Sequence, residues 1–329
     1  MTIRSIDNAR RRIRRAIILG LALVPIMASA DPGYPNRPVK ILLGFTPGSS
    51  SDAVLRMIAK PLSERLGTSV VVENKSGAGG IIAAESVAKA PADGYTLLFL
   101  ASAHATSAAM KKSLPYHPIN DFSWISSVVT YPMALAVAPG STFRSFAEVL
   151  QAAKANPKKY SYSSVGVGTA HHLLGEWVLS ESGAEMVHVP YRGGAGALTE
   201  LLGGRIDFMF DTMTGAAPLA KEKRINLLAI SSPEGQSPVP GVPAMADSLP
   251  GVVYESWLGI AAPPNTSPAI VERLNKEIRG ILAQEDIKRK LADMGATVKP
   301  GSPVEFRQRI EKDISIFRKI IAERKIEQE

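Results

Sequence analysis

The feature that most constrains the fold of this chain is an alternation between short β-branched runs and segments of helical periodicity. Such alternation favours βαβ units and largely parallel sheets, which is the α/β class. After the first run, Val54, Ile58, Leu62 and Leu66 lie four residues apart and form one apolar helix face. The predicted strands are residues 39–45, 69–73, 95–100, 160–164, 186–189, 206–210 and 226–230.

Helix starts are marked most clearly in the second half of the chain. Ser145 with Glu148, and Ser302 with Glu305, each fit a capping box, in which the two side chains satisfy backbone N–H groups reciprocally. Apolar residues at helical spacing over the last sixty residues predict two long amphipathic helices around a shorter one.

The first thirty residues have the pattern of a secretory signal peptide. Basic residues at 4–15 precede an apolar run at 16–27 and the small residues Ala28, Ser29 and Ala30. The apolar run is too short to cross a hydrocarbon core of about 30 Å as a helix. We therefore expect a soluble mature chain that begins at Asp31 and is exported, by either the general or the twin-arginine route.

Composition excludes several classes of function. The first thirty residues hold six of the 38 Lys and Arg side chains and one of the 30 Asp and Glu, so their removal lowers the net charge from +8 to +3. This charge does not indicate a nucleic-acid-binding protein. The chain has no cysteine, which excludes disulfides and thiolate chemistry, so a buried core must supply the stability.

Two extended stretches predict that the mature chain forms two lobes. Residues 124–133 and 252–263 each read as a strand that passes between lobes, and two crossings imply one discontinuous domain. We place lobe one at residues 31–132 plus 256–329 and lobe two at residues 133–255, with a ligand site between them.

Glycine-rich turns follow several predicted strands and precede helices. They include residues 45–52, 166–169 and 191–196. Each exposes backbone N–H groups at the positive end of a helix, and the carboxyl ends of strands are the expected ligand position in open α/β sheets. Three such turns together suit a carboxylate, although any single one is equally an ordinary connection. Asp52 fits a helix cap or loop brace better than a ligand contact, because a carboxylate repels an anionic ligand. Arg192 could neutralise a ligand, but the interpretation as a solvated charge in the turn is favoured.

Known enzyme motifs are missing from the sequence. His171 and His172 lack the spacing of a helical metal pair, and residues 77–80 lack the third glycine of a dinucleotide fingerprint and fit a tight turn. There is no Walker lysine and no G-x-S-x-G elbow. We therefore expect no catalytic residue, no metal and no cofactor.

Several motifs in collinear order resemble the Bug-type receptors of tripartite tricarboxylate transporters. The resemblance runs from about Tyr34 to the C-terminal helices. It departs from the family pattern in the first turn, where Thr46 and the serines 49–51 replace a second proline and further glycine, and this leaves the identity of the ligand open. The motifs lie at residues 34–40, 47–52, 71–80, 92–98, 114–116, 168–173, 189–193, 201–207 and 210–211.

This resemblance implies a type II periplasmic binding protein fold, in which two α/β lobes joined by a two-stranded hinge close on a small carboxylate. It also implies that the protein is periplasmic, needs no cofactor and delivers its ligand to an integral-membrane permease. We expect the protein to be a monomer. The implied ligand-binding residues come from the first turn, the wall after the third strand, the second motif and the end of a later strand; they are Phe45, Gly48, Ser49, Ser50, Ala103, His104, Gly168, Thr169, His172 and Asp211.

His172 is equally well interpreted as a packed residue on its helix. Two other functions stay open at this level. A partner that reports ligand to a membrane sensor would have the same sequence features, and a cleft hydrolase would need a triad or metal that the sequence does not display.

Overall fold

All seven predicted runs form strands whose ends lie within two residues of the expected bounds. The computed structural model describes residues 33–191 and 193–328, so the predicted signal peptide and Arg192 lie outside the described residues. The strands are β1 (Val39–Leu43), β2 (Val70–Asn74), β3 (Thr96–Ala101), β4 (Ser123–Val137), β5 (Ser161–Ser164), β6 (Val187–Pro190), β7 (Phe208–Thr212), β8 (Asn226–Ile230), β9 (Glu255–Ala262) and β10 (Thr297–Val298).

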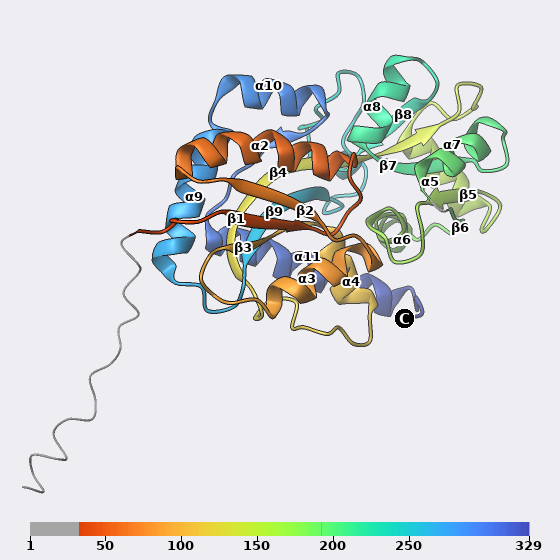
Figure 1. The fold of residues 1–329 in the computed structure, drawn as a ribbon. Coiled ribbons are helices and arrows are strands. Elements are labelled where there is room, and N and C mark those ends of the chain that lie inside the picture. The colour runs from red at the N-terminus through yellow and green to blue at the C-terminus, as the bar shows by residue number, and fades with distance from the viewer. Residues whose placement is uncertain (1–32, 192, 329) are drawn as a thin grey trace, which may run out of the picture. The chain divides into compact units, whose positions relative to one another are not determined.

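A helix or short helical turn follows most of these strands (Figure 1). The predicted capping box at Ser302 is present, with both reciprocal hydrogen bonds to Glu305, and Ser145 accepts from the Glu148 N–H. The helical elements are α2 (Ser50–Leu66), η1 (Ala78–Gly80), α3 (Ile81–Ala88), α4 (Ala103–Met110), α5 (Phe146–Ala155), α6 (Ala170–Ser182), α7 (Gly194–Leu202), α8 (Met213–Lys221), η2 (Met245–Asp247), α9 (Pro268–Leu282), α10 (Glu285–Asp293) and α11 (Pro303–Glu323).

The strands form one sheet in the order β2-β1-β3-β9-β4-β7-β5-β6, with β8 and β10 also paired to β4. Two groups of three parallel strands, β2-β1-β3 and β7-β5-β6, flank the antiparallel strands β9 and β4. The long strand β4 joins the two groups, because residues 123–132 pair with β9 and residues 133–137 pair with β7 and β8. The two stretches expected to pass between lobes are therefore β4 and β9.

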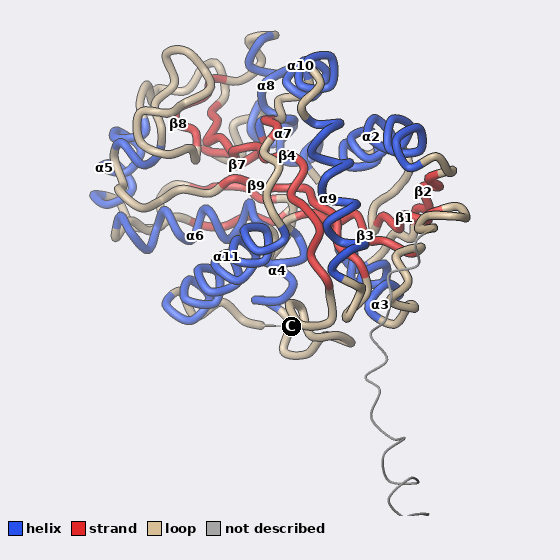
Figure 2. The backbone as a smooth tube through the Cα atoms, turned by 90° about the vertical axis from the view of Figure 1, so that its left-hand side faces the viewer, coloured by secondary structure: helices blue, strands red, loops and turns tan. Residues whose placement is uncertain are grey.

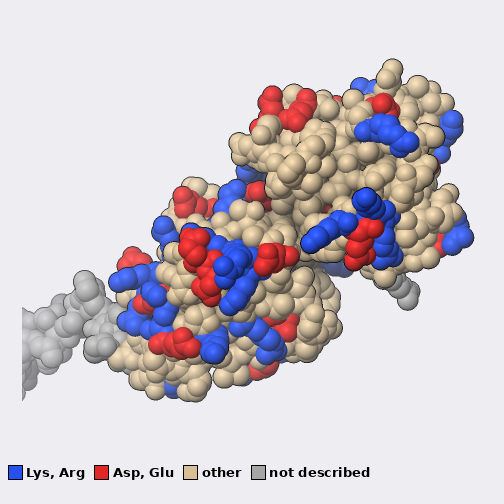
Figure 3. Space-filling view, turned by 90° about the horizontal axis from the view of Figure 1, so that it is seen from above, with Lys and Arg blue, Asp and Glu red and all other residues tan. Residues whose placement is uncertain are grey.

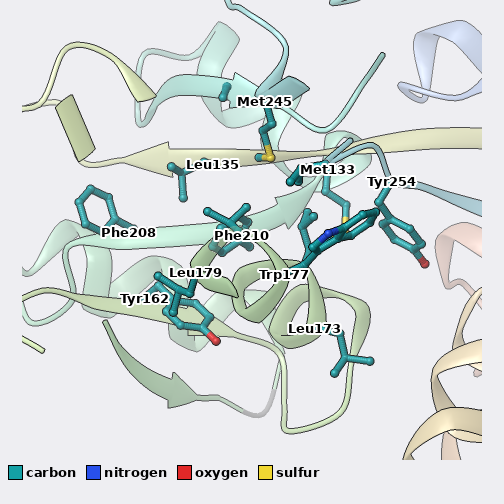
Figure 4. Packing of buried hydrophobic residues seen from close by; sticks show 14 of the residues in the cluster. Met133, Leu135, Tyr162, Leu173, Trp177, Leu179, Phe208, Phe210, Met245 and Tyr254 are labelled. Atoms are coloured by element: carbon teal, nitrogen blue, oxygen red, sulfur yellow. The ribbon is translucent and has the colours of Figure 1, made fainter. Parts of the chain in front are cut away.

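Apolar residues gather in separate clusters on the two parts of the sheet. One packs β1, β3 and β9 against α3 and α4, and another packs β4 and β7 against α5 and α6 (Figure 4). Helix α11 contributes to both, since Phe306 and Ile310 lie in the first cluster and Phe317 and Ile321 lie in the second. The C-terminal helix thus connects the two parts of the fold in addition to the strands β4 and β9, and it runs alongside α6 (Figure 2).

Among the described residues, no helix combines the length and the apolar character needed to cross a membrane. On the face shown in Figure 3, Lys and Arg side chains alternate with Asp and Glu and do not form a patch of one sign. This distribution agrees with the near-balanced charge of residues 31–329.

Candidate functional site

The carboxyl ends of the two parallel groups point toward each other along β4. Ala101, the last residue of β3, lies beside Leu258 of β9, which lies beside Val129 of β4. Thr212, the last residue of β7, lies beside Met133 of β4. Strand β3 runs in the same direction as β4 and β7 runs against it, so the two ends face each other across four residues of β4, or about 13 Å at the usual rise per residue. We call the loops and helix starts at these ends the strand-end site.

The turn after β1 is held from within by Asp52. Its Oδ2 accepts hydrogen bonds from the Gly48 N–H at 3.0 Å and from Arg56 Nε at 2.9 Å, and its Oδ1 accepts from Asn74 Nδ2 at 2.9 Å. The hydrogen bond from Arg56 is the largest of the effects that lower the pKa of Asp52 to about 2. Asp52 is therefore an ionised loop brace, which is the interpretation that the sequence favoured.

The predicted donors of this turn have different environments. The Gly48 N–H is occupied by Asp52, and Ser49 caps α2 by accepting from the Asp52 N–H at 3.3 Å. Ser50, at the first position of α2, is exposed, and its N–H has no acceptor within the helix. Phe45 is half-buried, and its carbonyl accepts from Asn74 Nδ2 at 3.0 Å. Ser50 is therefore an exposed donor of this turn whose N–H has no acceptor within α2.

His104 is a buried residue that lines a small pocket at this wall. It is 6% exposed, its ring stacks on Tyr116 and meets Phe122 and Trp124 edge-on, and its Nε2 lies 2.7 Å from the Pro118 carbonyl. Burial lowers the pKa of His104 to about 4, so the ring is neutral near pH 7. Ala103, the other residue predicted for this wall, is half-buried at the start of α4.

A small pocket borders this wall. Its volume of about 10 Å³ is enough for roughly one water molecule. Gly44 and Gly80 make their closest approach here, because a Cβ on Gly44 would lie 2.4 Å from the Gly80 Cα. Gly79 and Gly80 have φ values of 65° and 99°, as expected for the tight turn predicted at residues 77–80. The other lining residues include Phe45, Ala101 and Ser107.

The turn after β5 is held by His172. Its Nδ1 accepts from the Gly168 N–H at 3.1 Å, while Thr169 Oγ1 donates to the Gly166 carbonyl at 2.7 Å. His172 is only 5% exposed, and burial lowers its pKa. Its ring stacks on His188 with centroids 3.9 Å apart. His172 is thus packed beneath the turn, and Gly168 and Thr169 are half-buried above it.

A buried carboxylate extends this network to the C-terminal helix. Glu176, one turn along α6 from His172, lies 3.9 Å from His172 Nε2. It accepts from the Tyr162 hydroxyl at 2.6 Å and from Arg324 Nε at 2.7 Å. Sequence reasoning missed this set, because Tyr162, Glu176 and Arg324 share no local motif.

Asp211 lies between the start of α8 and the start of α6. Its Oδ1 accepts from the Thr212 N–H at 2.7 Å and lies 3.5 Å from His171 Nε2. A Cβ on Gly215 would lie 2.6 Å from Asp211 Oδ2, so only glycine leaves room for the carboxylate in the first turn of α8. The Nδ1 of His171 is buried without a hydrogen-bond partner among the described residues. Sequence reasoning examined His171 only as a metal ligand and did not connect it with Asp211.

Comparison with known proteins places this arrangement in a family context. The family model described as "Tripartite tricarboxylate transporter family receptor" matches residues 54–326. A UPF0065 protein from the tcbD-tcbE intergenic region of Pseudomonas sp. strain P51 is 34% identical over 316 residues, which cover 95% of this chain and 94% of that protein.

Two solved structures have the same fold. The periplasmic binding protein BugD is 29% identical with a TM-score of 0.74, covering 90% of this chain and 100% of that one. An R. palustris protein solved with adipate is 32% identical with a TM-score of 0.76, covering 88% and 98%. The predicted α/β periplasmic binding protein fold is confirmed by these similarities.

Proposed function

Because the chain belongs to the tripartite tricarboxylate transporter receptor family, we propose that it binds a small carboxylate at the strand-end site and delivers it to a membrane permease. The observation that carries this proposal is the facing arrangement of β3 and β7, which brings the starts of helices from both parallel groups to one region. Backbone N–H groups at helix starts favour anions. The structure with adipate shows that one relative with this fold holds a dicarboxylate.

The two sides of the site have different roles in this proposal. On the first side the Ser50 N–H and hydroxyl hold the carboxylate, while Gly48 and Ser49 shape the turn and Phe45, Ala103 and the buried His104 form the wall. On the second side, Thr169 and Asp211 contact the ligand, and His172 supports the turn through Gly168. Asp211 would repel an anion unless it is paired, and His171 is the neighbouring group that can pair with it.

Binding is coupled to hinge closure in this proposal. Residues 31–132 plus 256–329 form one lobe, residues 133–255 form the other, and β4 and β9 form the hinge. Closure adds the contacts from Thr169 and Asp211 to a ligand that the turn after β1 already holds. The chain acts as a periplasmic monomer after removal of residues 1–30, and it performs no chemistry on the ligand.

The primary test is a thermal-shift titration of residues 31–329 with mono-, di- and tricarboxylates and aromatic acids. A ligand at 100 times its dissociation constant stabilises the folded state by about 2.7 kcal/mol, so a saturable rise in melting temperature is expected for one subset. If no carboxylate raises the melting temperature of protein refolded from denaturant to remove carried-over ligand, the proposal fails.

A proline substitution tests the site itself. Ser50→Pro removes both the N–H and the hydroxyl at the first helical position, where proline is tolerated, and the preceding Ser49 already has the extended conformation that proline requires, with φ −66° and ψ 159°. We expect roughly tenfold or greater loss of affinity, as for at least one hydrogen bond to a charged group, with little change in ligand-free stability. Glu285→Pro, at the first position of α10, is the matched control. Equal affinity in the two variants would place the carboxylate elsewhere.

A further inference from the structure

Met110 is the last residue of α4, and its side chain lies against the turn after β5. A Cβ on Gly168 would lie 2.7 Å from Met110 Cγ, 3.1 Å from its Cε and 3.3 Å from its Sδ. Gly168 also has a φ of 71°, which favours glycine. Since Met110 is only 4% exposed, this turn of the strand-end site rests on a buried side chain from another helix.

Helix α4 contributes to both apolar clusters of the fold. Ala105 and Ala108 lie in the cluster of β1, β3 and β9, whereas Ala109 and Met110 lie in the cluster of β4 and β7. The helix begins at Ala103, two residues after the end of β3. It therefore reaches from the wall on the first side of the strand-end site to the turn on its second side.

The carboxyl end of α4 is held by the C-terminal part of the chain. Arg318 Nη2 of α11 donates to the Ala108 carbonyl at 3.3 Å, and Gln328 Nε2 donates to the Ala109 carbonyl at 2.8 Å. The last carbonyls of a helix have no donor within the helix, and a cation at this end is favourable. Helices α4 and α11 also pack against each other (Figure 1). The backbone that carries Met110 is thus fixed at the point where the turn rests on it.

Resting on the receptor function proposed above, we propose that Met110 is a positioning residue for carboxylate binding. It holds the turn after β5 in its binding arrangement without touching the ligand. Thr169, which the proposed function assigns to the ligand, directly follows Gly168, so a shift of Gly168 displaces Thr169. A binding loop that is held in its bound conformation loses less entropy when the ligand binds. Truncation of Met110 leaves a cavity beside Gly168 into which the turn can shift, and affinity falls.

The first test truncates two buried methionines of one apolar cluster in residues 31–329. Met110→Ala removes the contact with Gly168, whereas Met245→Ala removes a side chain on the opposite side of the cluster from Leu173 of α6 (Figure 4). Both variants should have a lower melting temperature, because each leaves a cavity. Calorimetric titration with adipate, or with the acid that gives the largest thermal shift, should show about tenfold weaker binding for Met110→Ala and a change within about twofold for Met245→Ala. Met110→Leu keeps most of the side-chain volume and should bind within about threefold of wild type.

Hydrogen exchange in the ligand-free protein tests the same role without a ligand. The Gly168 N–H donates to His172 Nδ1 at 3.1 Å, and the Thr169 N–H donates to the Gly166 carbonyl at 3.3 Å. Amides in turns exchange through local opening, which does not follow the global stability. Exchange at these two amides should therefore be about tenfold faster in Met110→Ala and within about twofold of wild type in Met245→Ala.

A double variant tests the contact itself. Gly168→Ala should weaken adipate binding about tenfold in the wild-type background and only about threefold in the Met110→Ala background. The reason is that the three Met110 atoms nearest to the new methyl group are then absent, and only the strain of the positive φ remains. Equal factors in the two backgrounds would show that Met110 does not act through Gly168.

The positioning role is overturned if Met110→Ala keeps wild-type affinity or wild-type exchange at Gly168 and Thr169, or if Met245→Ala shows the same losses. If the wild-type protein binds no carboxylate, the receptor function fails, and the exchange measurement alone decides whether Met110 positions the turn.

Discussion

The turns after β1 and after β5 are built on the same geometry with different chemistry. In each, a glycine N–H donates to the side chain four residues later, at the third position of the following helix: Gly48 to Asp52, and Gly168 to His172. Asp52 is an anion at the positive end of α2, bonded to the half-exposed Arg56. His172 is neutral, because a cation there would be both desolvated and at the wrong end of the helix.

Because one brace is an ionised Asp52 and the other a neutral His172, the two turns are held by different sets of partner side chains. Asp52 depends on Arg56 and Asn74, so the turn after β1 is held by groups of its own part of the sheet. His172 belongs to a buried set that reaches Arg324 just beyond the end of α11 through Glu176. If the proposed ligand moves the turn after β5, we expect the C-terminal helix to respond, whereas a ligand held at the turn after β1 should act locally.

The largest expected effect comes from separating the turn after β5 from the C-terminal helix. Arg324→Gln leaves the buried Glu176 with the Tyr162 hydroxyl and His172 near it, and breaking this partly buried ion pair should cost about 3 kcal/mol. Urea unfolding measures this loss. Lys319→Gln, which breaks an exposed pair with Glu323, is the control and should cost less than about 0.5 kcal/mol. A similar loss in both variants would show that the buried connection has no special role.

The second effect tests the brace of the other turn. Asp52→Ala leaves the Gly48 N–H and Asn74 Nδ2 without this acceptor, and we expect a loss of about 2 kcal/mol in unfolding free energy. Carboxylate affinity should fall as well, because Ser50 lies on the same turn. Glu85→Gln, which removes an exposed pair with Lys89, provides the comparison and should change stability little. Unchanged stability in Asp52→Ala would mean that the turn keeps its shape without the brace.

Acid should weaken the turn after β5 before the turn after β1. Burial lowers the pKa of His188 to about 3 and also lowers that of His172, so below pH 6.5 the unfolded state binds protons that the folded state does not. The stability present at pH 7 therefore declines as the pH falls from about 6.5, whereas the contribution of Asp52 is lost only as the pH falls from about 4 toward 2.

His188→Phe tests this order while keeping a ring stacked on His172. Between pH 7 and pH 5 the variant should lose about 2 kcal/mol less unfolding free energy than the wild type. The variant and the wild type are compared at each pH, because burial raises the pKa of Asp313 to about 6. Protonation of Asp313 therefore adds stability to both proteins as the pH falls, and this contribution cancels in the difference. Parallel curves would show that the histidine pair does not carry the acid sensitivity.

The smallest expected change in stability comes from removing the side-chain hydroxyl at the start of α2 or of α6. Ser49 accepts from the Asp52 N–H as a helix cap, whereas Thr169 donates back to Gly166 and makes no cap bond. Ser49→Ala should cost about 1 kcal/mol, as for loss of a helix cap, and should reduce amide protection at the start of α2 in hydrogen exchange. Thr169→Ala should instead affect protection within residues 166–169. If the two variants reduce protection in the same part of their helices, the difference between the turns is smaller than the structure indicates.

The sequence determined the features that depend on near neighbours along the chain. Strand ends, the crossing stretches that became β4 and β9, the capping box at Ser302 and the bracing role of Asp52 all follow from local spacing and side-chain chemistry. The spacing of Gly168 and His172 was equally available, because it repeats that of Gly48 and Asp52. A comparison of the two motifs would have indicated that His172 is a brace.

Only the tertiary structure decided which distant groups meet. The sequence predicts His104 as a wall residue, and only the structure shows that the aromatic side chains of residues 116–124 pack around it. Glu176 and Arg324 are 148 residues apart, and they meet only because α11 packs beside α6. Local propensity sets where strands and helices begin and end, whereas burial and pairing between remote segments set which polar groups are satisfied and which are left for a ligand.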